Sequence, residues 1–190
     1  MRAFLAIDLP ENIRDTLAGI QGELKKGAAD VKWVSPGNIH LTLKFLGEIN
    51  DNQAEKIKAI LAETAQHHQA FYIKINSLGA FPKLDYPRVI WAGALEGKAE
   101  TEAIAAELEE KIIQMGIPKE EKPFACHITL GRVRSSLNKE RLVKAILGLN
   151  DSLKKETMEF PAFKITFYKS TLTPNGPLYQ ILNEAVLKTN

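Results

Sequence analysis

The stretch IHLTLKFLGE at positions 39–48 has a shorter counterpart in CHITLGRVR at positions 126–134. In both, a histidine is followed two residues later by a threonine, within a run of β-branched and leucine residues. Such a run predicts a β-strand, whose side chains point alternately to the two faces of a sheet. Each strand therefore offers an imidazole and a hydroxyl on one face and apolar side chains on the other.

By this alternation, His40 and Thr42 share one face, whereas the other face carries Leu41, Leu43 and Phe45. His127 and Thr129 share a face in the same way. An imidazole can give or take a proton near pH 7, and a hydroxyl can donate a hydrogen bond to an oxyanion. Four such groups facing one cleft suit the cleavage of a small anion, most simply a phosphodiester.

The similarity between the two halves extends beyond the histidine strands. Each is followed by a predicted helix that contains the letters KAIL, at 58–61 and at 144–147. Each helix leads to a β-like segment with aromatic residues and an IK or KI pair, at 71–75 and 162–168. No Ser/Gly-rich linker separates the halves. We therefore expect a single domain over 1–190, built from two similar lobes that are related by a rough two-fold repeat.

The remaining pattern predicts an α+β protein. Apolar residues three and four apart predict helices, and short apolar runs between Gly, Pro and Asp predict strands. The helix at 138–147 is expected to stop at Gly148, and the turn TPNGP at 173–177 to join the last two strands. Besides the histidine strands, the expected elements are helices at 11–26, 52–67, 100–115 and 138–147, and strands at 3–9, 31–34, 71–81, 88–95, 158–172 and 177–187.

Composition limits the classes of function. The 190 residues are 45% hydrophobic and 25% charged with a formal charge of +2, which is too mild for bulk attraction to nucleic acid. An anionic partner must therefore be held by a local basic cluster. Cys126 is the single cysteine, which fits a reducing compartment, and Asp8 ends the first apolar run too early for a signal peptide. We expect a soluble cytoplasmic protein without a membrane partner, and a monomer by default.

Other kinds of site fit the sequence less well. Zinc sites usually need three or four ligands, and Cys126 belongs to the apolar face of its strand. The His67–His68 doublet lies at an expected helix end, where adjacent residues do not share a face, so we expect a solvated pair. The sequence has neither a nucleophile elbow nor a glycine-rich phosphate loop. No metal and no cofactor are therefore expected.

The paired motifs resemble the signature of the two-histidine phosphoesterase superfamily, in particular the RNA 2′,3′-cyclic phosphodiesterases, historically called 2′-5′ RNA ligases. The resemblance spans nearly the whole chain, through MRAFLAID, HLTLKFLGE, RVIWAG, HITLGRV and STLTPNGPLY. It implies a bilobed α+β fold, with two antiparallel sheets and flanking helices around a central cleft. It also implies that His40 is the proton donor and His127 the proton acceptor, while Thr42 and Thr129 hold phosphate oxygens.

The family commonly has an arginine at the position of Arg132, which makes this residue a further candidate phosphate ligand. Strict alternation puts Arg132 on the face opposite His127, so the strand must bulge at Gly131 or end there. Several strand aromatics could stack a nucleobase, but most such residues belong to a core, and none is assigned as a base contact. These aromatics are Trp33, Phe45, Phe81 and Trp91.

The resemblance thus implies metal-independent opening of 2′,3′-cyclic phosphates to 2′-phosphomonoesters, on RNA ends such as those of tRNA halves or on cyclic nucleotides. Two alternatives stay open: joining of RNA halves through a 2′-5′ bond at the same site, and a module that only binds RNA ends. The two histidines argue against binding alone, because arginine and lysine bind phosphate better at neutral pH. Turnover of excess substrate would distinguish an enzyme from a binder.

Overall fold

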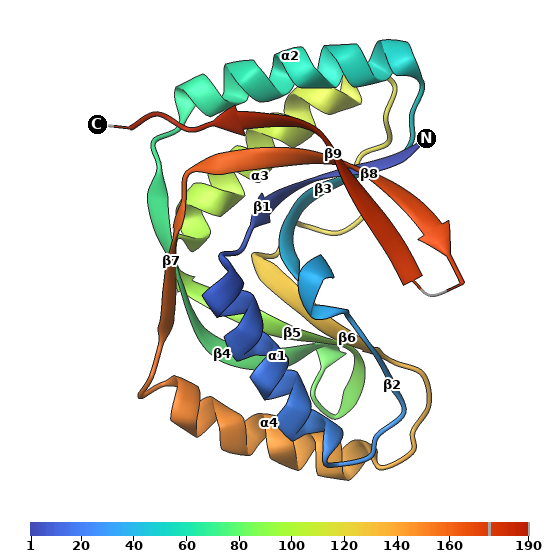
Figure 1. The fold of residues 1–190 in the computed structure, drawn as a ribbon, viewed down its shortest axis with the longest axis vertical. Helices are drawn as coiled ribbons and strands as arrows, with labels where there is room; N and C mark the ends of the chain where they lie inside the picture. The colour runs from blue at the N-terminus through green and yellow to red at the C-terminus, as the bar shows by residue number, and fades with distance from the viewer. Residues whose placement is uncertain (175, 190) are drawn as a thin grey trace.

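The structure is a computed structural model that describes residues 1–174 and 176–189. Four helices and nine strands form an α+β fold with a curled sheet (Figure 1). The helices are α1 (Glu11–Lys25), α2 (Asp51–His67), α3 (Lys98–Ile113) and α4 (Lys139–Leu153). The strands are β1 (Arg2–Asp8), β2 (Val31–Trp33), β3 (His40–Glu48), β4 (Phe71–Lys83), β5 (Tyr86–Glu96), β6 (His127–Val133), β7 (Met158–Ala162), β8 (Lys164–Thr173) and β9 (Gly176–Val186).

The strands form one antiparallel sheet in the order β7-β4-β5-β6-β3-β1-β8-β9, with β2 paired to β6. The two halves of this sheet meet between β3 and β6, where Leu41 and Ile128 form the one registered pair in the described part of the chain. The expectation of two separate sheets is therefore wrong. The halves stay continuous because this single pair joins them, and they separate on both sides of it.

The strand order is symmetric about the β3–β6 junction. Moving outward, β3 is followed by β1, β8 and β9, and β6 is followed by β5, β4 and β7. Each half also contains one long antiparallel hairpin, formed by β8 and β9 in one half and by β4 and β5 in the other. The three strands on each side of the junction agree with the predicted repeat, although the β4–β5 hairpin adjoins β6 directly whereas β1 separates β3 from the β8–β9 hairpin. The expected central cleft stays a prediction.

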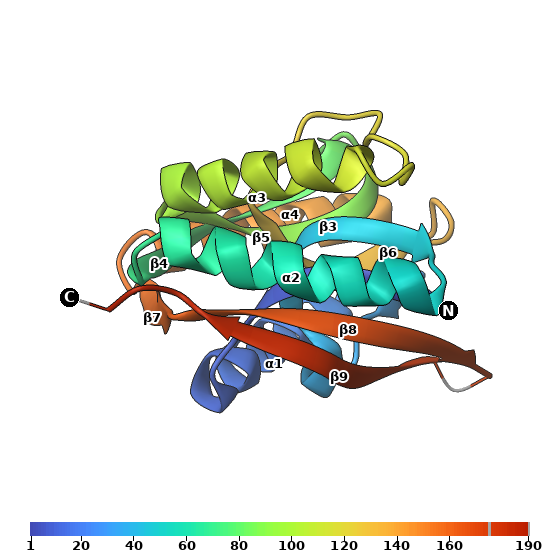
Figure 2. The same cartoon turned by 90° about the horizontal axis from the view of Figure 1, so that it is seen from above.

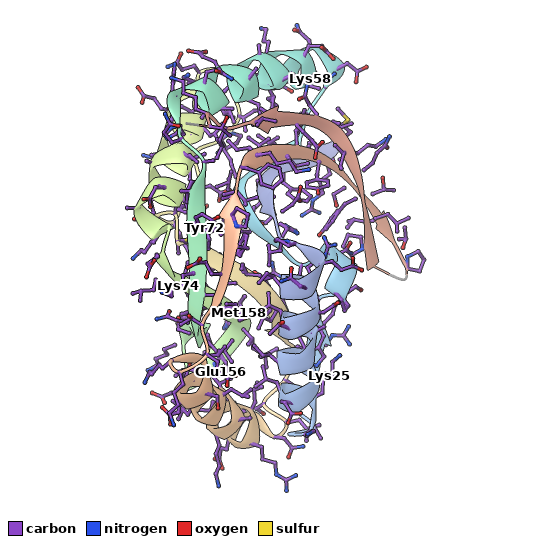
Figure 3. All side chains as sticks on the ribbon, turned by 60° about the vertical axis from the view of Figure 1, so that its left-hand side comes forward. Lys25, Lys58, Tyr72, Lys74, Glu156 and Met158 are labelled. Carbon is purple, nitrogen blue, oxygen red and sulfur yellow. The ribbon has the colours of Figure 1, made fainter. Side chains whose placement is uncertain are left out.

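The helices contact the sheet in two groups. α2 and α3 contact each other. In addition, α2 contacts β8 and β9, and α3 contacts β3 and β5. α1 and α4 also contact each other. In addition, α1 contacts β7, and α4 contacts β4. Figure 2 shows α1 and α3 on opposite sides of the strands. In Figure 3, Tyr72 and Lys74 mark β4, which runs beside the edge strand that begins at Met158.

Most elements begin and end within a few residues of the predicted positions. The stop predicted at Gly148 is wrong, since α4 continues to Leu153. Leu153 is buried and Leu149 packs against the core, so these two extend the apolar side formed by Leu142 and Ile146. Their burial outweighs the roughly 1 kcal/mol that a glycine costs inside a helix.

The last predicted strands differ in one detail. The strand expected over 158–172 is divided at Phe163, which separates the edge strand β7 from β8. The hairpin of β8 and β9 is present as predicted, but the turn predicted at 173–177 includes Asn175, which lies outside the described residues. In the part of the chain that the structure describes, no helix is long and apolar enough to cross a membrane.

Candidate active site

The two histidine motifs meet at the junction of β3 and β6, on one face of the sheet. The registered pair that joins these strands is almost fully buried, whereas the four motif histidines and threonines are partly exposed. One step from that pair along each antiparallel strand, His40 comes level with Thr129, and Thr42 comes level with His127. Alternation puts all four on the face opposite the buried pair. The structure therefore brings together the four residues that the sequence singled out.

The two imidazoles are held in the same way. His40 Nδ1 lies 2.7 Å from the carbonyl oxygen of Asn38, and His127 Nδ1 lies 2.7 Å from the carbonyl oxygen of Ala125. Because a carbonyl oxygen can only accept, each Nδ1 carries a hydrogen and donates it. The Nε2 of each ring is then the atom that can take or give a proton. Each half of the chain thus presents its histidine in the same tautomer.

The charges near the two histidines differ. Burial lowers the pKa of His40, while the Asn38 carbonyl and the negative charge of Asp8 act in the opposite direction. Burial also lowers the pKa of His127; its backbone carbonyl partner raises it, and the positive charge of Arg132 lowers it further. The charged neighbours, Asp8 and Arg132, therefore favour a proton on His40 and disfavour one on His127.

Asp8 is fixed on the strand next to His40. Its Cα is the registered partner of His40 in the β1–β3 pair. The Thr166 hydroxyl donates to Asp8 Oδ2 at 2.6 Å, and the Tyr168 hydroxyl donates to Oδ1 at 2.5 Å. The amino group of Lys164 lies 3.9 Å from Asp8 Oδ2. These contacts hold the carboxylate in place beside the imidazole, without a direct bond between the two.

A β-bulge brings Arg132 to the histidine face. In the β5–β6 pair, Trp91 is registered with Thr129 and Val89 with Arg132, which leaves Leu130 as an extra residue in β6. Since Val89 and Trp91 are two residues apart in β5, their partners share one face. The bulge that the sequence required for Arg132 is confirmed, although the extra residue is Leu130 rather than the glycine after it.

A second bulge changes the face of Phe45. In the β1–β3 pair, Ala6 is registered with Thr42 and Phe4 with Phe45, so Leu43 is the extra residue of β3. Phe45 therefore lies on the histidine face with 53% of its surface exposed, and the prediction of the opposite face is wrong. Lys44 is turned inward by the same bulge, where it is buried and paired with Glu109 of α3.

Aromatic rings support both imidazoles. Phe4 stacks on His40 with ring centroids 4.8 Å apart, and Tyr179 meets the same imidazole edge-on at 5.4 Å. Phe81 meets His127 edge-on at 5.0 Å. These contacts restrict the orientation of both rings, so that each Nε2 keeps a fixed direction.

This geometry has counterparts among known proteins. The profile of the LigT-like phosphoesterase family matches the chain twice, at residues 7–91 and 95–179. The chain belongs to the LigT-like phosphoesterase family. Each match contains one histidine motif, so the family profile supports the internal repeat that the sequence and the strand order indicate.

Relatives within the family match this chain over nearly its full length. An RNA 2′,3′-cyclic phosphodiesterase of Methanocaldococcus jannaschii is 42% identical over 185 residues, which are 97% of this chain and 99% of that protein. A protein of the same name from Aquifex aeolicus is 35% identical and covers 98% of this chain and 97% of its own.

Solved structures show the same LigT-like fold. The protein TT0787 of Thermus thermophilus has a TM-score of 0.78 at 27% identity and covers 98% of both chains. Escherichia coli LigT complexed with 3′-AMP has a TM-score of 0.76 at 23% identity, with 98% of this chain and 97% of that chain covered. The second likeness supports the fold alone.

Two other predictions about the site's surroundings can be compared with the structure. His67 is half exposed as expected, but His68 is mostly buried, and each ring lies 2.8 Å from a different oxygen of Glu107. The doublet therefore links α2 to α3 through hydrogen bonds to Glu107, and its expectation as a solvated pair is only partly met. Within the described residues, no three His, Cys, Asp or Glu side chains are grouped as a metal site would need.

Sequence reasoning missed three residues of this LigT-like site, namely Asp8, Phe4 and Tyr179. Asp8 had a signal, because a carboxylate ends an otherwise apolar strand, yet it served only to mark the strand's end. Phe4 and Tyr179 had none, since an aromatic residue in a strand fits a core equally well. Their contacts with His40 depend on the pairing of β1 and β3 and on the β8–β9 hairpin.

Proposed function

We propose that this protein hydrolyses 2′,3′-cyclic phosphate ends of RNA to 2′-phosphomonoesters without a metal ion, with His40 and His127 as the catalytic pair. The observation that carries the proposal is the matched tautomer of the two imidazoles, each tied through Nδ1 to a backbone carbonyl. The names of the relatives support the same substrate. Two Nε2 atoms on one face of the sheet can reach opposite sides of one phosphorus atom.

The charges near the site support one assignment of the acid and base roles. Arg132 disfavours a proton on His127, so its neutral Nε2 takes a proton from the attacking water as the oxygen–phosphorus bond forms. Asp8 favours a proton on His40, whose Nε2–H gives that proton to the departing ribose oxygen as the ring opens. After the reaction, His127 is protonated and His40 is neutral, and exchange of one proton each with solvent restores the starting state.

The other polar groups of this face stabilise the charge on the phosphate. The hydroxyls of Thr42 and Thr129 can donate to non-bridging oxygens, and they add no charge of their own. Arg132 supplies the positive charge and can donate two hydrogen bonds to one phosphate. Strand alternation keeps the two threonines on the face of the imidazoles, and the bulge at Leu130 adds Arg132 to it.

The test uses an RNA oligonucleotide that ends in a 2′,3′-cyclic phosphate, in excess over the protein. We expect multiple turnovers and a 2′-phosphate product, identified by phosphorus NMR against both isomers. A 3′-phosphate product would mean that the ribose lies reversed between the histidines, and the assigned roles would be wrong. Consumption of one equivalent or less would favour a module that only binds RNA ends, and a longer RNA with a 2′-5′ bond would favour ligation.

A further inference from the structure

A hollow of about 340 Å³ lies where β1 begins, between the end of β3 and the outer part of β8. No residue of this hollow takes part in the hydrolysis proposed above. It has both basic and polar walls, and its lining residues are Met1, Arg2, Glu48, Lys169, Ser170, Thr171 and Leu172.

The side of the hollow formed by Arg2 and Ser170 continues the histidine face beyond His40. Arg2 shares a face of β1 with Phe4, two residues away, and Phe4 stacks on His40 with a centroid distance of 4.8 Å. On the other side of the hollow, Ser170 is the registered partner of Tyr179. The ring of Tyr179 meets the imidazole of His40 at 5.4 Å. One layer of aromatic rings therefore separates the hollow from the candidate proton donor.

The direction in which the cyclic phosphate opens determines which part of the RNA lies on the His40 side of the phosphorus atom. In a cyclic phosphate, the leaving oxygen belongs to the ribose, and water attacks the phosphorus from the opposite side. A proton donor at His40 therefore requires the ribose and the rest of the RNA on the His40 side. The hollow at Arg2 is on this side, whereas Arg132 and His127 face the water.

The charges in the hollow suit a phosphodiester. Within residues 1–174 and 176–189, neither Arg2 nor Lys169 makes an ion pair, and Arg2 is exposed. Glu48 is the one carboxylate of the lining, and its Oε2 is 3.2 Å from the amino group of Met1. Arg2 is thus available to an anion, and an arginine can hold two phosphate oxygens at once. Lys169 is registered with Ala3, the neighbour of Phe4, so its side chain lies on the other face of the sheet.

An exposed ring lies between the hollow and the histidines. Phe45 is 53% exposed, shares the histidine face of β3, and has its ring centroid 6.3 Å from that of Phe4. Exposed aromatic rings stack nucleobases with little dependence on sequence. A base on Phe45 would thus belong to the nucleotide whose ribose faces His40.

We propose that this hollow binds the nucleotide that precedes the cyclic-phosphate nucleotide, with its linking phosphodiester on Arg2 and the terminal base on Phe45. The proposal rests on the hydrolysis proposed above and extends it to the substrate class: oligonucleotide ends are preferred over cyclic mononucleotides. The preference is the ratio of kcat/KM for the dinucleotide ApA with a 2′,3′-cyclic phosphate end to kcat/KM for adenosine 2′,3′-cyclic phosphate.

The test measures this preference in the unmodified protein and in three variants. We expect a ratio of about ten or more, since one added phosphate contact of about 1.4 kcal/mol gives a tenfold effect. Arg2→Gln should lower the ratio about three- to tenfold, towards one, whereas Lys169→Gln, on the other face of the sheet, should leave it nearly unchanged. Lys74→Gln removes the same charge in the other half of the sheet (Figure 3) and should leave the ratio unchanged.

Salt provides an independent measurement, because contacts with phosphate weaken as counterions compete. The ratio should fall when the ionic strength rises from about 50 to 200 mM, and the fall should be smaller in Arg2→Gln. Hydrolysis of both substrates with a ratio near one would overturn the hollow's role and leave the hydrolysis intact. A high ratio that Arg2→Gln does not lower would overturn the assignment to Arg2, and loss of hydrolysis with both substrates would overturn the proposed function itself.

Discussion

Replacing Asp8 by asparagine tests how the two histidines acquire different roles. Asp8 faces His40 in the β1–β3 register, and its negative charge raises the pKa of that imidazole against the larger effect of burial. Without the charge, His40 loses its proton at a lower pH. On the proposed mechanism, the alkaline limb of the pH profile of kcat/KM then moves to lower pH. The acid limb, which reports on His127, should stay where it is.

The size of the effect follows from the register. Facing side chains in an antiparallel pair have Cβ atoms about 5 Å apart. At about 5 Å, unit charges attract by about 0.8 kcal/mol in water and about 3 kcal/mol at an effective dielectric constant of 20. Asp8 is partly exposed and already accepts from Thr166 and Tyr168, so we expect about 1 kcal/mol. This corresponds to about a fivefold lower kcat/KM on the alkaline limb.

The assay records initial rates of cyclic-phosphate opening between pH 4 and pH 9, as about ten points per variant. Asp8→Asn also weakens two hydrogen bonds to a charged group, so a loss of about 1–3 kcal/mol in the free energy of unfolding is expected, and circular dichroism checks that the variant is folded. Asp15→Asn, on the exposed side of α1, is the matched control. A uniform loss of rate at every pH, with both limbs unmoved, would refute the electrostatic role of Asp8.

Four further outcomes are expected. His40→Ala and His127→Ala should each lower kcat about 10²–10⁴-fold with Tm changed by only a few degrees, as measured by turnover and thermal melting. Chelator should leave activity unchanged. Because burial lowers both imidazole pKa values, both limbs of the bell-shaped pH profile should lie below about pH 6.5. Arg132→Gln should lower kcat/KM about 10²-fold and move the acid limb to higher pH, because the charge that lowers the pKa of His127 is gone. Gly79→Ala should lower the free energy of unfolding by about 1–3 kcal/mol, since a Cβ there would lie 2.3 Å from an indole carbon of Trp91. Gly37→Ala, which has no atom within 4 Å of the added Cβ, should be neutral in the same denaturant titration.

Local patterns predicted the elements well because they reflect local physical constraints. Helical spacing of apolar residues located α1 to α3, and the strand alternation located β3 and β6 with their histidines. The end of α4 was predicted too early, because glycine propensity is local whereas the burial of Leu153 depends on the packed core. The joining of the two halves into one sheet depends on a single long-range pair, which no local pattern indicates.

The two bulges show where strand alternation stops being reliable. Arg132 gave a signal, because a phosphate ligand on the wrong face requires a bulge, and the structure has one at Leu130. Phe45 gave no signal for a bulge, because an apolar residue fits the buried face on which alternation placed it. The bulge at Leu43 reverses it and buries Lys44 instead, where Glu109 compensates the charge. A bulge can be inferred from sequence only when a residue of known role would otherwise face the wrong way.

A duplicated motif supplies two equivalent histidines, whereas hydrolysis needs one that is neutral and one that is protonated. The asymmetry arises on the neighbouring strands, where Asp8 faces His40 but Gly93 faces His127. Gly93 cannot simply be exchanged for a second aspartate, because its Cβ would lie 2.7 Å from the ring of Trp91 and 2.8 Å from the Ser77 hydroxyl. The packing of β5 thus excludes a carboxylate opposite His127. On the proposed mechanism, the acid and base roles are fixed by this packing and by Arg132, and neither histidine motif carries the distinction itself.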